Sequence, residues 1–162
     1  MHQISLGILN KRDCPWFHVS SAALVGLLGS LLRWWVQRFM VTIGVTDNLQ
    51  LELWGVWEGL QLVKSLGITR LIVKQDVVWV VNMLSRPFEA GHPLGTLIDD
   101  SLVLIQEGRV LNVHHILREK NRCAHHLANL AQTEAIAGAS VYLSNPPLSL
   151  LSLLHEDSKR AW

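Results

Sequence analysis

Two adjacent histidines, His125 and His126, stand in the first turn of a helix that residues 121–132 (NRCAHHLANLAQ) predict. Imidazole is a common metal ligand, so the pair raises the question of a metal site. Neighbouring residues on a helix point about 100° apart, and the chain has neither an HxxxH motif nor a cysteine at metal-binding spacing. A dedicated zinc site is therefore disfavoured. The pair is either an ordinary helix surface or includes a histidine where another residue type does the chemistry.

Two carboxylates occupy positions where sites are common. Glu52 lies in the first turn of a predicted helix, and Asp76 ends a predicted strand. Proteins of the α/β class place binding sites at the carboxyl ends of strands. Each acid also has a plain structural interpretation, because a glutamate near a helix start favours the helix dipole and an aspartate between strand and helix caps the helix. Neither acid identifies a site by itself.

An alternation of helices and strands must position these residues. Leucine and valine recur at intervals of three and four between residues 49 and 63, which predicts an amphipathic helix that Asp47 caps and Gly67 ends. Downstream the pattern predicts a strand at 69–76 (TRLIVKQD), a short buried helix capped by Asp76 at 77–84 (VVWVVNML), a helix at 93–108 and a strand at 109–117 (RVLNVHHIL). This order predicts an α/β sheet with helices on its faces.

Composition and charge narrow the class of protein. The length of 162 residues fits one domain, and 49% apolar with 17% charged residues predicts a folded chain. A formal net charge of +1 gives no global field, so a nucleic-acid partner must be met by a local patch. Cys14 and Cys123 lie far apart without CxxC spacing, which favours a reduced intracellular compartment.

The longest apolar run, residues 22–32 (AALVGLLGSLL), is too short for the roughly 20 residues that cross a bilayer. Lys11 and Arg12 precede it as in a signal peptide, but no small cleavage-site residues follow. We therefore predict a pair of buried strands with bends near Gly26 and Gly29. We expect an intracellular protein of the nucleus or cytoplasm, not secreted and without a membrane partner.

Two longer stretches carry a family resemblance. Residues 49–76 contain LELWGVWEGLQLVKSLGI and a strand ending KQD, and residues 115–132 contain HILREKNRCAHHLANLAQ. Their order and spacing resemble the ribonuclease H-like domains of plants, which are related to the ribonuclease H portion of non-LTR retroelement polymerases. The family pattern is close to A-E-L-W-A/G-x-x-E-G-L-x-x-A-x-x-L-G-I, a strand ending E-x-D, then H-V-x-R-E-x-N-x-x-A-D-x-L-A. The resemblance runs from about Ile43 to Gln132.

The resemblance implies a mixed five-stranded sheet and a particular chemistry. In this family four carboxylates bind two divalent ions, which activate a water and stabilise the leaving oxygen as RNA in an RNA-DNA hybrid is cut. Glu52 and Asp76 match two of these carboxylates and become the expected ligands of magnesium or manganese. His125 stands at the family aspartate of the last helix, so we expect weakened metal binding.

The fourth acid of the family, usually an Asp-Gly pair in the first strand, has no clear match. Trp16–Val19 is the expected start of that strand, and no acid lies between Cys14 and Thr46. Asp13 precedes the expected strand and is interpreted as a surface residue. We expect a divergent N-terminal segment at 1–18, a ribonuclease H-like domain at 19–139, and a tail at 140–162, where Pro146 and Pro147 break any helix.

Arg118, Lys120 and Arg122 surround the turn before the last helix, where they could hold a phosphate backbone without reading sequence. The alternative is a solvated loop partly neutralised by Glu119. We interpret His115 as a core histidine, because it alternates with Leu111, Val113 and Leu117. We interpret three tryptophans as packing residues: Trp54, Trp57 and Trp79.

Two functions remain open at this point. One is a metal-dependent ribonuclease that cuts RNA in hybrids, and the other is a catalytically impaired nucleic-acid-binding module or retroelement relic of the same fold. In both, the expected partner is hybrid or duplex nucleic acid bound without sequence preference by a monomer. A hybrid-cleavage assay with magnesium and with manganese separates them.

Overall fold

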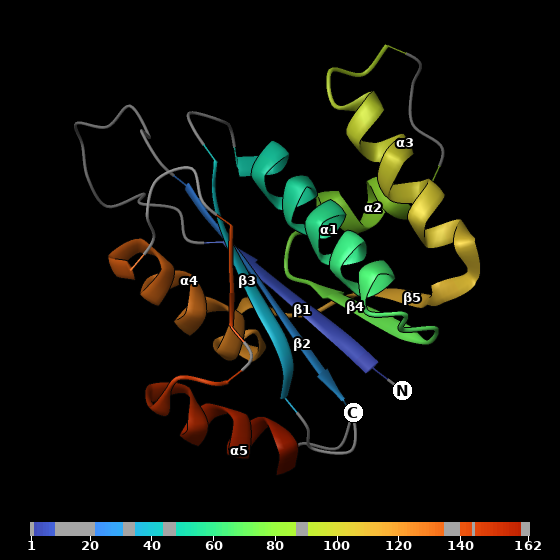
Figure 1. Ribbon diagram of the computed structural model, residues 1–162. Coiled ribbons are helices and arrows are strands. Elements are labelled where there is room, and N and C mark those ends of the chain that lie inside the picture. Colours follow the sequence, from blue (N-terminus) through green and yellow to red (C-terminus); the bar gives the residue numbers. More distant parts are fainter. Residues whose placement is uncertain are drawn as a thin grey trace, which may run out of the picture.

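The computed structural model describes residues 2–8, 22–30, 35–43, 48–86, 91–134, 140–143 and 145–159 (Figure 1). The strands are β1 His2–Ile8, β2 Ala22–Ser30, β3 Trp35–Ile43, β4 Leu71–Gln75, β5 Val110–His115 and β6 Ser140–Leu143. The α-helices are α1 Asn48–Ser65, α2 Val78–Ser85, α3 Gly95–Leu104, α4 Arg122–Glu134 and α5 Leu151–Lys159. The predicted α/β class is confirmed.

The described strands form one mixed sheet in the order β5-β4-β1-β2-β3-β6. The β1–β4 and β4–β5 pairs are parallel, whereas β1–β2, β2–β3 and β3–β6 are antiparallel. The described sheet has six strands where the family resemblance implied five. The carboxyl ends of β1, β4 and β5 therefore meet at one end of the sheet, which is where Asp76 follows β4.

Helices cover both faces of the sheet, with α1, α2 and α3 on one side and α4 and α5 on the other (Figure 1). Helix α1 lies against β1 and β2 and buries its apolar face there, and β4 adds alternate apolar side chains to the same core. Leu53, Val56 and Val63 of α1 are fully buried and share one core cluster with Leu71 and Val73 of β4. This core holds the polar residues of α1 over the sheet.

Helix α1 ends as its sequence predicts. Gly67 has a φ of +65°, a backbone conformation that residues with a side chain rarely adopt. The N–H of Ile68 donates to the carbonyl of Val63 at 3.1 Å, which closes the helix in the manner of a Schellman motif. The short connection leads directly into β4.

The N-terminal part of the chain differs from the expectation. Residues 2–8, expected to belong to a divergent segment, form β1 in the middle of the sheet between β2 and β4. The expected strand start at Trp16–Val19 lies outside the described residues. Residues 22–30, expected to form two strands, form the single strand β2, whose pairing with β3 is irregular between Leu28 and Gly29. Antiparallel partners on both sides hold β2 extended through its glycines.

The C-terminal part also differs from the expected tail. Ser140–Leu143 pairs with β3 as β6, and the segment that follows Pro147 packs against α4. Leu150, in a 3-10 turn at Leu148–Leu150, is fully buried and leads into α5. An apolar side chain with no exposed surface explains why this segment stays on the domain. None of the described helices is both long enough and apolar enough to cross a membrane.

Candidate active site

Glu52 is a buried acid on the core-facing side of α1. It lies four residues after Asn48, so it belongs to the second turn and the expectation of a first-turn position was wrong. Its spacing of four residues to Val56, and of eight to Leu60, places it on the helix face that packs on the sheet. Only 8% of Glu52 is exposed, which is rare for an acid and requires compensation by hydrogen bonds.

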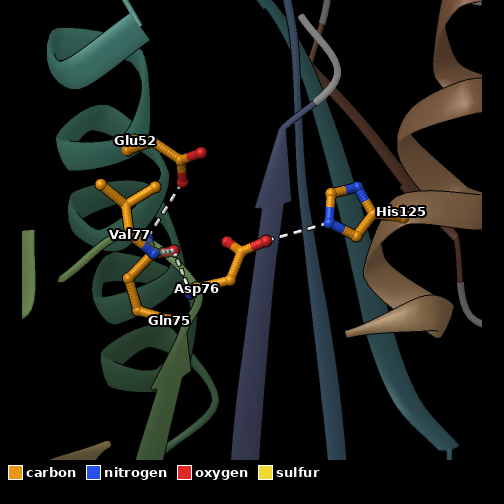
Figure 2. Close-up of polar contacts among 5 residues, drawn as sticks. All are labelled: Glu52, Gln75, Asp76, Val77 and His125. Carbon is orange, nitrogen blue, oxygen red and sulfur yellow. Dashed lines mark hydrogen bonds and ion pairs between the residues drawn. The ribbon is translucent and has the colours of Figure 1, made fainter. Parts of the chain in front are cut away.

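Gln75, the last residue of β4, supplies that compensation. It is fully buried, and its Nε2 donates to Glu52 Oε2 at 3.0 Å (Figure 2). Its Oε1 accepts the backbone N–H of Asp76 at 2.7 Å and that of Val77 at 3.2 Å. One side chain therefore joins Glu52 of α1 to the backbone that leaves β4.

Asp76 follows Gln75 and points the other way. Residue alternation along β4 directs Gln75 toward α1 and Asp76 toward α4, as Figure 2 shows. Asp76 Oδ2 lies 2.9 Å from His125 Nε2, and the Asp76 side chain is only 6% exposed. Its Oδ1 is buried and has no hydrogen-bond partner among the residues that the structure describes. The expectation that Asp76 caps α2 was wrong, because Val77 is the N-cap residue and no side chain caps this helix.

His125 comes from the first turn of α4 and reaches across to the end of β4. Its backbone N–H donates to the carbonyl of Asn121 at 3.1 Å, which begins the helix. The neighbouring His126 faces away, with Nε2 at 2.9 Å from Ser149 Oγ in the C-terminal segment. The two histidines therefore have separate partners, and only His125 belongs to the site.

The electrostatics of the site favour a protonated Glu52. The pKa of Glu52 is raised from 4.5 to about 8, mainly by burial and then by the nearby Asp76, and this net value already includes the lowering by the Gln75 hydrogen bond and by Arg118. Desolvation is the largest of these causes because a charge on a buried carboxyl loses its water shell. Near neutral pH the Glu52 carboxyl group is therefore mostly protonated in the free protein.

The basic cluster consists of Arg118, Lys120 and Arg122, of which Arg118 is close enough to Glu52 to lower its pKa. Arg118 and Lys120 are exposed on a 3-10 turn that follows β5. Arg122 Nη1 lies 2.6 Å from Glu156 Oε2 of α5, with both side chains about half exposed. No sequence pattern pointed to Glu156, because a contact between residues 34 positions apart has no periodic signature.

Other predicted packing residues have mixed outcomes. His115 is exposed, so its interpretation as a core histidine was wrong. Trp79 is 71% exposed and is not a core residue. Trp54 and Trp57 are half-buried on α1 and pack edge to face, with ring centroids 5.2 Å apart, as the packing interpretation predicted.

The first-strand acid of the family pattern has no counterpart in β1, whose residues are HQISLGI. In the parallel β1–β4 register Leu6 pairs with Gln75, so the Leu6–Gly7 step stands beside Asp76 where an Asp-Gly pair would be needed. Asp13 lies outside the described residues.

These donors do not fit a two-cation site. Two carboxyl groups supply at most two negative charges against the four positive charges of two divalent ions, and burial favours protonation of one of them. Within the described ranges no three His, Cys, Asp or Glu side chains are arranged to hold a metal ion. Of the two Asp76 oxygens, Oδ2 is taken by His125 and Oδ1 has no partner among the described residues, so Asp76 offers one open acceptor there.

Comparison with known proteins identifies the fold. Residues 26–131 match a family model described as reverse transcriptase-like. A protein of Arabidopsis thaliana named as a ribonuclease H protein is 31% identical over 137 residues, which are 85% of this chain and 22% of the relative. The chain therefore spans less than a quarter of that relative's length.

Solved structures agree. RNase H1 of the halophilic archaeon Halobacterium salinarum NRC-1 superposes with a TM-score of 0.70 at 21% identity, over 83% of this chain and 98% of that one. LC11-RNase H1, solved in complex with an RNA/DNA hybrid, gives a TM-score of 0.68 at 19% identity, over 83% and 99%. The fold that holds Glu52, Gln75, Asp76 and His125 is thus that of ribonuclease H, and the chain belongs to the reverse transcriptase-like family of ribonuclease H-like proteins.

Proposed function

We propose that this chain is a nucleic-acid-binding ribonuclease H-like domain whose metal-dependent cleavage of RNA-DNA hybrids is impaired. The observation that carries the proposal is the 2.9 Å contact between His125 Nε2 and Asp76 Oδ2. His125 places an imidazole where the family has a carboxylate. Its contact also occupies Asp76 Oδ2, an oxygen that a cation would need as a ligand. Leu6, in place of an acid in β1, removes a second ligand.

Binding of nucleic acid is supported by the exposed cations beside the site. Arg118 and Lys120 lie at the carboxyl end of the sheet, where a backbone phosphate can approach both, and neither is needed for the core. The small net charge of +1 makes such a local patch the source of any affinity. Contacts to phosphate alone carry no sequence information, so we expect hybrid and duplex to be bound without sequence preference.

An active hydrolase is the second candidate, and one observation favours it. Asp76 Oδ1 is buried and has no hydrogen-bond partner in the described part of the chain, and a buried unpartnered acceptor is costly unless a cation or water satisfies it. In this family divalent ions activate the attacking water and stabilise the leaving oxygen. With Glu52 and Asp76 as the only matched carboxyl groups, we expect this activity to be weak with magnesium and with manganese.

Two assays test the proposal. Binding is measured by fluorescence anisotropy of a labelled RNA-DNA hybrid in EDTA, at several salt concentrations, for the wild type and for the Arg118→Ala/Lys120→Ala variant. For the wild type, we expect the logarithm of the hybrid-binding constant to fall against the logarithm of the salt concentration with a slope of about −2. The double variant should lose most of this salt dependence. Arg70→Ala is the matched control, because Arg70 is equally exposed but precedes β4 at the opposite end of the strand.

Cleavage of the same hybrid is followed with magnesium and with manganese. Rapid cleavage by the wild type that Glu52→Ala abolishes would establish the hydrolase instead. Binding that is insensitive to salt, or that Arg118→Ala/Lys120→Ala leaves unchanged, would contradict the assigned surface. An intracellular location and a monomeric state remain part of the proposal and are tested by fractionation and by sedimentation.

A further inference from the structure

Gln75 occupies a position that the sequence patterns left without a role. It is a fully buried polar side chain on the face of β4 that otherwise carries Leu71 and Val73. A buried amide at such a position is retained only where its donor and acceptor are satisfied. Its oxygen accepts two backbone N–H groups, and its nitrogen donates to Glu52.

The acceptor end of Gln75 satisfies two backbone groups at the point where the chain leaves β4. Backbone N–H groups beyond the end of a strand need an acceptor when they are shielded from water. Here the N–H groups of Asp76 and Val77 both reach Gln75 Oε1, at 2.7 and 3.2 Å. This pair of bonds holds the backbone of Asp76, whose carboxylate points toward α4 and meets His125 at 2.9 Å.

The donor end of Gln75 holds the other acid. Its Nε2 lies 3.0 Å from Glu52 Oε2, deep enough that both side chains are more than nine-tenths buried (Figure 2). In a dry environment such a bond is strongly directional, and rotation of the Glu52 side chain would leave both groups unpartnered. A single amide thereby fixes Glu52 on one face of β4 and the direction of Asp76 on the other.

We propose that Gln75 is the positioning residue of the Glu52–Asp76 pair, and that it couples Glu52 to the Asp76–His125 contact through its two ends. Leucine, methionine or valine would fill the same space without either bond. Aspartate or asparagine, one methylene shorter, would not span from β4 to Glu52. This role is independent of the proposed function, since it concerns the free protein in the absence of nucleic acid.

The coupling is measured by NMR at one fixed pH on protein carrying nitrogen-15 in glutamine and histidine. In the wild type we expect the two Nε2 protons of Gln75 to be well separated, with one shifted downfield by its bond to Glu52. Glu52→Gln keeps a carbonyl acceptor and should preserve the separation, whereas Glu52→Leu should collapse it. This pair of variants leaves Gln75 in place, so it tests the donor end even where Gln75 variants fold poorly.

The second measurement concerns His125. Gln75→Leu should shift the ring-nitrogen resonances of His125 and lower Tm by about 4–10 °C. Leu104→Ala, at a buried position in α3, is the control for loss of stability alone and should leave the His125 resonances unchanged. The proposal is overturned if Leu104→Ala moves His125 as much as Gln75→Leu does, or if Glu52→Leu leaves the Gln75 amide unchanged. A failure of hybrid binding would leave both NMR results untouched, so the two proposals fail separately.

Discussion

Replacing His125 by aspartate tests the central contact of the site. In the absence of metal the variant loses the 2.9 Å bond to Asp76 Oδ2 and gains a carboxyl group beside one that is only 6% exposed. A hydrogen bond to a charged group contributes about 1.5–3 kcal/mol, and two like charges at 4 Å repel by about 4 kcal/mol at an effective dielectric constant of 20. Protonation of one carboxyl relieves much of the repulsion. We therefore expect the free energy of unfolding to fall by about 2–4 kcal/mol, or Tm by roughly 5–15 °C.

The assay is thermal unfolding followed by circular dichroism in EDTA, in magnesium and in manganese. His125→Asp should be destabilised in EDTA and partly restored by manganese, whereas the wild type should respond little to either ion. His126→Asp is the matched control, because the adjacent histidine faces Ser149 instead of the site. Hybrid cleavage should stay low in His125→Asp and rise only when Leu6→Asp is added, since Leu6 pairs beside the end of β4.

Two results would refute this reasoning. If His125→Asp were as stable as the wild type in EDTA, the Asp76–His125 contact would not contribute as its geometry implies. If manganese stabilised the wild type and His125→Asp equally, the imidazole would not be what limits metal binding.

Three further predictions follow from other parts of the structure. Because the pKa of Glu52 is raised from 4.5 to about 8, folding favours its protonated form. The free energy of unfolding should therefore fall as pH rises from about 4.5 to 8, by on the order of 4 kcal/mol at pH 8. Chemical unfolding across this range should show the loss in the wild type and a much flatter profile in Glu52→Gln. Glu156→Gln should free Arg122 and tighten hybrid binding by about twofold to fivefold at low salt. Glu107→Gln, which breaks the similar 2.6 Å pair with Lys64 elsewhere on the surface, should have a smaller effect, and equal effects would show that only net charge matters. Leu150→Ala should cost about 2–4 kcal/mol because Leu150 is fully buried, and an unchanged Tm would mean that the C-terminal segment does not contribute to the stability of the domain.

The elements from α1 to α4 could be predicted from the sequence because they follow simple periodicities. The apolar repeat of α1, the stop at Gly67 and the strand ending at Asp76 each have a local cause. Glu52, Asp76 and His125 were expected at the site from the family pattern, and the structure brings all three to the end of β4, with Gln75 between Glu52 and Asp76 (Figure 2). Their roles toward a cation stay predictions.

What the sequence did not predict depends on contacts between distant residues. Strand β1 carries polar residues and pairs in parallel with β4, which comes much later in the chain, so its place in the sheet has no local signature. The role of Gln75 as a hydrogen-bond donor depends on Glu52, which lies 23 residues earlier in the chain. Leu150 and Glu156 were placed in a tail because their partners on α4 are far away in the sequence.

The contact between Asp76 and His125 also constrains the order in which substitutions can accumulate in a lineage that carries it. Changing His125 to aspartate removes a partner from a nearly buried carboxylate, while Leu6 still offers no ligand that would let a cation replace it. That step lowers stability and gains no chemistry, so selection opposes it when it comes first. An acid at Leu6, introduced while His125 still contacts Asp76, leaves the existing contact in place, so we expect this order of substitutions to be the less costly one. Related chains that keep the histidine are therefore expected to vary in β1 more freely than at Asp76.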